Sequence, residues 1–81
     1  MDADKSATYK TLEERYGVLM SYDALARVMN RSSDGLRLSL SSGRATEDWV
    51  MKVNQAKIRI GRRILFRTVQ IAAWIDEQAH Q

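Results

Sequence analysis

Two short amphipathic helices separated by only a few polar residues are the feature that most constrains this chain. Ser21 has the chemistry of an N-cap. The apolar side chains after it recur at helical spacing: Ala24, Leu25, Val28 and Met29. Residues 30–33, Asn-Arg-Ser-Ser, have turn and cap chemistry, and Leu36 and Leu40 then recur at i, i+4 before Gly43 ends a helix of about nine residues. This arrangement predicts a helix-turn-helix, whose second helix is presented to a partner.

Residues 57–67 predict a β-hairpin, because they are rich in strand-forming side chains and are interrupted by Gly61. A two-residue turn of Gly61 and Arg62 would mix apolar and charged side chains on one face, since Ile60 would lie opposite Arg63. A three-residue tip that also includes Arg63 gives one apolar face instead. Its cross-strand pairs are Ile60 with Ile64 and Ile58 with Phe66. We therefore expect the three-residue tip.

An additional N-terminal helix is expected at about residues 8–17. It contains a capping-box pattern, Thr11 with Glu14, and is followed by Gly17. Glycine readily adopts the left-handed conformation that ends many helices. We therefore expect Gly17 to end this helix in that conformation.

Two more helices complete the expected fold. One is a short helix within residues 45–56, and the other is capped by Thr68. The apolar side chains of the second lie at helical spacing: Ile71, Trp74 and Ile75. A chain of 81 residues with 44% apolar content can bury one modest core. The predicted fold is mainly α with a small β-hairpin, in one domain over residues 1–81 with its core at about 19–75.

Positive charge is concentrated in the middle of the chain, although the net charge is only +3. Residues 1–30 carry four Lys and Arg against five Asp and Glu, residues 31–67 carry nine against three, and residues 68–81 carry none against two. A cationic block within a folded chain is typical of proteins that bind a polyanion such as nucleic acid.

The chain lacks the residue patterns of catalysis and of metal binding. It has no cysteine, and its one histidine, His80, has no second histidine or cysteine to complete a metal site. Ser32, Ser33 and Ser41 have no general base to activate them. We therefore expect no enzymatic activity, no cofactor and no metal. The apolar runs are too short to span a bilayer and the acidic start is unlike a secretory signal, so we expect a cytoplasmic protein without a membrane partner.

Five short fragments occur in a characteristic order. They are Leu25-Ala26, Arg31-Ser32-Ser33, Ser42-Gly43-Arg44, the stretch from Ile58 to Arg63, and Ala73-Trp74-Ile75. Together, over about residues 19–75, they resemble the MerR-like winged helix-turn-helix fold of the excisionase family, the small DNA-binding proteins of phages, plasmids and integrative elements. Two features depart from that family: the segment 44–57 is longer than usual, and Arg37 is the one cation within the recognition helix.

The resemblance implies which side chains contact DNA. The recognition helix would lie in the major groove, where Arg37 can bond guanine O6 and N7 together. Residues at the start of that helix would hold phosphates, and the arginines of the hairpin, or wing, would reach the adjacent minor groove or its flanking phosphates. The residues predicted to bind DNA are Arg31, Ser32, Ser33, Arg37, Ser41, Arg44, Arg59, Arg62 and Arg63.

The expected function is therefore sequence-specific binding of double-stranded DNA. The protein would act as an excisionase-like recombination directionality factor or as a small transcriptional regulator of a mobile element. Its further partners would be an integrase or other recombinase, RNA polymerase, or copies of itself on DNA, and it would join the nucleoid when bound. The alternative is a winged-helix protein–protein interaction module whose Arg62 and Arg63 meet an acidic protein surface. RNA binding is disfavoured, because the stacking aromatics of RNA-binding sheets are missing.

Overall fold

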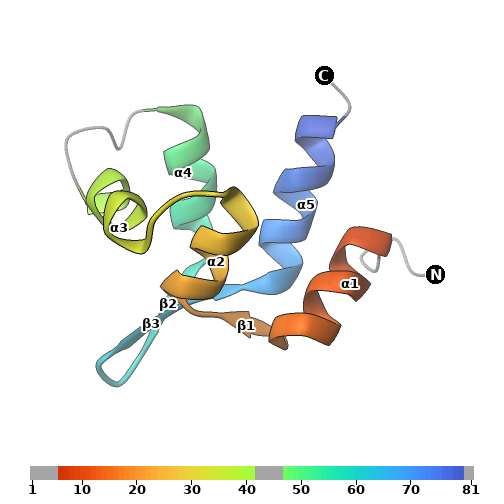
Figure 1. Cartoon of the computed structure of the whole chain (residues 1–81), viewed down its shortest axis with the longest axis horizontal. Helices are drawn as coiled ribbons and strands as arrows, with labels where there is room; N and C mark the ends of the chain where they lie inside the picture. The colour runs from red at the N-terminus through yellow and green to blue at the C-terminus, as the bar shows by residue number, and fades with distance from the viewer. Residues whose placement is uncertain (1–5, 42–46, 80–81) are drawn as a thin grey trace.

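Figure 1 shows a computed structural model of the chain, which describes residues 6–41 and 47–79. Within these residues the chain is mainly helical and contains one small antiparallel sheet, as expected. The helices are α1 (Ala7–Tyr16), α2 (Tyr22–Met29), α3 (Ser33–Ser41), α4 (Asp48–Gln55) and α5 (Thr68–Ala79). The strands are β1 (Leu19–Met20), β2 (Lys57–Ile60) and β3 (Arg63–Arg67).

Helices α2 and α3 follow one another closely, and local signals set the ends of α2. Before it, the Ser21 hydroxyl accepts a hydrogen bond from the Ala24 N–H at 3.1 Å. After it, Asn30 adopts the left-handed conformation, with φ 58° and ψ 45°, which asparagine tolerates better than most residues. The Arg31 N–H then donates to the Ala26 carbonyl at 2.9 Å. Because these signals are local, both helices lie where the sequence predicts.

Helix α1 begins one residue before the predicted range 8–17, but its cap lies five residues before the predicted cap, Thr11. The Ser6 hydroxyl accepts from the Tyr9 N–H at 3.1 Å and is the N-cap. The predicted capping box is therefore wrong, since Thr11 and Glu14 both lie inside the helix. Gly17 does end α1 with a positive φ of 88°, but its ψ of −172° is not the left-handed helical value that we expected.

The two terminal helices, α1 and α5, pack against each other. The Thr8 hydroxyl donates to the Asp76 carboxylate at 2.6 Å. Thr68 was expected to cap α5, but it is the first residue of that helix and is fully buried. Its hydroxyl donates to the Gly17 carbonyl at 2.7 Å and its N–H to the Val18 carbonyl at 3.0 Å. Thr68 thus joins α5 to the connection between α1 and β1.

The sheet has the strand order β1-β3-β2, with both pairings antiparallel. Strand β1 places Met20 opposite Phe66, and both side chains are fully buried. The sequence did not predict this strand. It is only two residues long, and it exists because β3 offers it a hydrogen-bonding edge.

The hairpin of β2 and β3 has a different register from the one expected. Ile60 lies opposite Arg63, so the turn consists of Gly61 and Arg62, and the predicted three-residue tip is wrong. Gly61 has φ +62°, and glycine at the first turn position is the mark of a type II′ turn. Strand β2 is an edge strand in a hairpin that projects beyond the helices (Figure 1), so burial does not sort its side chains and the turn sets the register.

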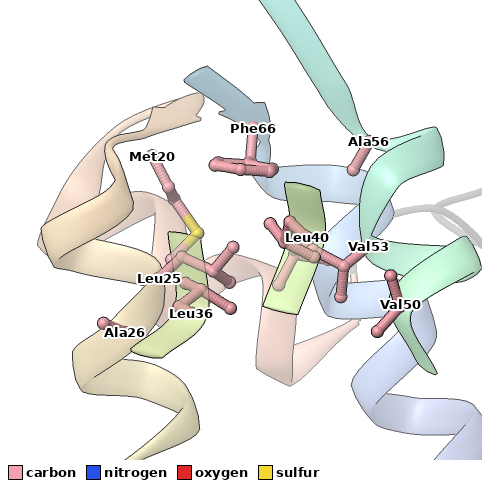
Figure 2. Packing of buried hydrophobic residues seen from close by; sticks show 10 residues of the cluster. Met20, Leu25, Ala26, Leu36, Leu40, Val50, Val53, Ala56 and Phe66 are labelled. Atoms are coloured by element: carbon pink, nitrogen blue, oxygen red, sulfur yellow. The ribbon is translucent and has the colours of Figure 1, made fainter. Parts of the chain in front are cut away.

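The core lies between the sheet and the helices (Figure 2). It contains the buried side chains Met20, Leu25, Ala26, Leu36, Leu40, Val50, Val53, Ala56, Phe66 and Ile71. Figure 2 shows Leu40 of α3 between Phe66 of β3 and Val53 of α4. Val50 and Val53 are fully buried, so α4 belongs to the core.

Candidate functional site

Helix α3 has one buried and one exposed face. Leu36 and Leu40 pack into the core. The exposed side chains recur at i, i+3, i+4 and i+7 and therefore share one stripe. They are Asp34, Arg37, Leu38 and Ser41. This face offers an acid, a cation, an apolar group and a hydroxyl to whatever lies against it.

The three serines predicted to contact DNA all have partners within the chain. The Ser32 hydroxyl accepts from the Gly35 N–H at 3.0 Å and so caps α3. The Ser33 hydroxyl donates to the Asp23 carboxylate. The Ser41 hydroxyl donates at 2.8 Å to the backbone carbonyl one turn earlier. These serines shape the start of α3, join it to α2 and support its last turn.

Replacing Ser32 by alanine should lower the free energy of unfolding by about 1 kcal/mol, because the first turn of α3 loses its cap. For a domain of this size that corresponds to a melting temperature lower by about 4–8 °C, measured by circular dichroism. Ser41→Ala is the matched control in the same helix, with an expected change within about 0.5 kcal/mol, since Ser41 is exposed. Equal shifts for both variants would contradict the capping role.

The Arg37 side chain packs against two aromatic rings, the second of which belongs to the core. Its guanidinium carbon lies 4.5 Å from the centre of the Tyr22 ring. The Tyr22 ring in turn meets Phe66 edge to face, with ring centres 5.1 Å apart and an interplanar angle of 81°. A cation over an aromatic face is attracted by the ring electrons. Arg37 is therefore exposed but held in one place.

Arg31 has a similar support from a different element. Its guanidinium carbon lies 4.5 Å from the centre of the Trp49 ring, on α4. The Trp49 indole N–H donates to the Glu47 carboxylate at 2.9 Å, directly before the same helix. Helix α4 thus fixes the cation that lies in the turn before α3.

Two arginines near the tip of the hairpin line a hollow together with a side chain of α3. Arg62, Arg63 and Arg59 are all exposed, and the Arg59 Nε–H donates to the Gly61 carbonyl at 3.3 Å. Together with Arg37, the first two flank an open hollow of about 250 Å³, which we call the arginine hollow. Its lining residues are Ser21, Tyr22, Asp23, Arg37, Arg62, Arg63 and Ile64. In Figure 1, α3 and the hairpin turn lie on one side of the molecule and α1 on the other.

The charge around the arginine hollow is not balanced. Within the described parts of the chain, Arg37, Arg62 and Arg63 form no ion pair with a carboxylate. The acidic residue that lines the hollow, Asp23, accepts a hydrogen bond from the hydroxyl of Ser33. Three arginines against one carboxylate make this hollow attractive to an anion.

The structure therefore brings together Arg37, Arg62 and Arg63 from the predicted set, and it places the Arg31 guanidinium over the Trp49 ring of α4. Arg44 lies outside the described residues. Sequence reasoning missed the support that Tyr22 gives to Arg37. The local signal was an aromatic residue directly after an N-cap, which does not reveal the cation that it meets.

Comparisons of the chain with protein-family models, with curated proteins and with solved structures found no match. Among residues 6–41 and 47–79, no group of three or more His, Cys, Asp or Glu side chains is placed to hold a metal ion. No helix in the same residues is long and apolar enough to cross a membrane.

Proposed function

We propose that this protein binds double-stranded DNA in a sequence-specific manner, without enzymatic activity. The observation that carries the proposal is the arginine hollow, where Arg37 of α3 and Arg62 and Arg63 of the hairpin converge and form no ion pair with a carboxylate among the described residues. The phosphate backbone of DNA is the dense, extended anion that such an arrangement fits.

In this proposal α2 and α3 act as a helix-turn-helix and the β2–β3 hairpin acts as its wing. Three features support it: the short turn between the two helices, the exposed face of α3, and the projecting hairpin, whose Arg62 and Arg63 line a hollow together with Arg37. Helix α3 then enters the major groove with its exposed stripe against the base edges. Arg37, held on Tyr22, pairs with guanine O6 and N7.

The arginine hollow holds the DNA backbone in this arrangement. When α3 lies in the major groove and the hairpin turn reaches the next minor groove, the strand that separates the two grooves crosses the space between them. That space is the hollow flanked by Arg37, Arg62 and Arg63. Arg31, in the turn before α3, holds a second phosphate near the N-terminal end of that helix.

Within this function, two biological roles use the same surface. One is that of an excisionase-like directionality factor, which shapes DNA beside a recombinase. The other is that of a small transcriptional regulator that meets RNA polymerase. Both place the protein on specific duplex sites through the α3 and hairpin side, and both leave the α1 and α5 side free for protein partners.

Selection from a pool of random duplex DNA tests the proposal. The purified wild-type protein should enrich one short motif at fixed salt concentration. Arg37→Ala should relax the preference at one or two positions of that motif, by about 1–3 kcal/mol per position. If no duplex is enriched over the starting pool, the DNA proposal fails and the protein–protein interaction module takes its place.

Tyr22 provides a second test, because it positions Arg37 without lying on the exposed face of α3. Tyr22→Leu should reduce the discrimination at the Arg37-dependent position by roughly two- to fivefold, which corresponds to about 0.5–1 kcal/mol for one exposed cation–π contact. Tyr22→Phe keeps the ring and should behave like the wild type. The discrimination of each variant is obtained from fluorescence anisotropy titrations with the enriched duplex and with duplexes changed at a single position. The positioning role is contradicted if the leucine and phenylalanine variants discriminate equally well.

A further inference from the structure

Leu38 is the most exposed of the large apolar side chains in the described parts of the chain. Its exposed fraction is 70%, whereas Leu36 and Leu40 of the same helix are 0% and 4% exposed. It is not among the partly buried side chains that pack against the core. Folding therefore gives little reason for a leucine at this position, since most of its surface stays in water.

The neighbours of Leu38 place it among the groups proposed to face DNA bases. It precedes Ser41 by three residues and follows Asp34 by four, so the three side chains lie on one stripe of α3. Arg37, directly before it, lines the arginine hollow. An apolar side chain in this position needs an apolar partner on the surface that the helix meets.

The major groove offers one such partner. Among the base edges exposed there, thymine alone carries an apolar group, the C5-methyl, while the other edges present hydrogen-bond donors and acceptors. A leucine side chain held against donors and acceptors would desolvate them without replacing their hydrogen bonds. It is compatible with the methyl group.

We infer that Leu38 is a specificity-determining residue that recognises a thymine through its C5-methyl group, at a base pair neighbouring the one read by Arg37. This inference rests on the proposed function, because it assigns α3 to the major groove. It adds a residue and a base that a cationic surface alone does not define.

Substitution of thymine by deoxyuridine tests this inference, because it removes only the methyl group. Each thymine of the enriched duplex is replaced in turn, and the dissociation constants are measured for the wild type, for Leu38→Ala and for Met51→Ala. Met51 is the control, an apolar side chain on α4 that is 50% exposed. Circular dichroism checks that both variants keep the wild-type fold, as expected for exposed positions.

At one thymine, the replacement should weaken wild-type binding by about fourfold, the effect of one buried methyl group. The Met51→Ala variant should lose the same factor, whereas Leu38→Ala should bind the thymine and deoxyuridine duplexes equally. If Leu38→Ala loses as much as the wild type at every thymine, or if no thymine matters to the wild type, the inference is overturned while specific DNA binding stands. If the wild type prefers no duplex, the proposed function itself fails, and the selection shows this before any thymine is replaced.

Discussion

Replacing Phe66 by alanine is expected to lower the free energy of unfolding by about 3–5 kcal/mol, the usual cost of deleting a large buried aromatic side chain. Phe66 is fully buried on the middle strand of the sheet, opposite Met20, and its ring meets the edge of Tyr22. A chain of 81 residues has a total stability of about 4–12 kcal/mol. The substitution therefore removes a large share of it and weakens the support of Arg37 at the same time.

Urea denaturation followed by tryptophan fluorescence and by circular dichroism measures this loss. Val18→Ala is the control, since Val18 is 59% exposed and surface substitutions usually change the stability by less than about 0.5 kcal/mol. A free energy of unfolding for Phe66→Ala within about 1 kcal/mol of the wild-type value would contradict the role of Phe66 in the core, because the side chain would then contribute far less than its burial implies.

The largest effect on binding is expected from the double variant Arg62→Ala, Arg63→Ala. Loss of two charged phosphate contacts, at about 1.5 kcal/mol each, should weaken binding to the enriched duplex by roughly 100-fold near 0.1 M salt. For each phosphate contact that is lost, fewer counterions are released when the variant binds DNA. The slope of log K against log salt concentration should therefore become shallower by about 1.8. Fluorescence anisotropy titrations at several salt concentrations give both values.

A second double variant, Lys10→Ala, Arg15→Ala, removes the same charge from exposed positions of α1. Helix α1 lies away from α3 and the hairpin turn (Figure 1), so this variant should lose less than about threefold in affinity. If the two double variants weaken binding equally, net charge rather than the arginine hollow governs the interaction, and the proposed site is wrong.

The parts of the fold that the sequence predicted well are those with local causes. Ser21 and Asn30 mark the two ends of α2, and the spacing of Leu36 and Leu40 indicates α3. Caps and helical periodicity depend only on residues a few positions apart. Strand β1 was missed because two residues such as Leu19 and Met20 form a strand only when another strand pairs with them.

The hairpin register was mispredicted for a different physical reason. The prediction assumed that both strands sort their side chains by burial, which would favour one apolar face. Ile60 is instead 54% exposed at the end of an edge strand, and Gly61 closes a two-residue turn. Turn geometry decides the register where burial is weak.

The candidate site was predictable in composition but not in arrangement. The cationic character of Arg37, Arg62 and Arg63 is visible in the sequence, and their convergence at one hollow follows from the fold. Contacts between cations and aromatic rings are tertiary. The sequence could not indicate that Trp49 would meet Arg31, eighteen positions earlier, until α4 was placed in the core.

The proposed DNA-binding surface consists of the exposed face of α3 and the hairpin turn. Titration of the ¹⁵N-labelled protein with the enriched duplex, followed by amide chemical shifts in NMR spectra, tests it most directly. The largest changes are expected on residues 31–41 and 59–63, with much smaller changes on α1 and on the exposed side of α5. Changes confined to α1 and α5, or no changes at saturating duplex, would contradict it.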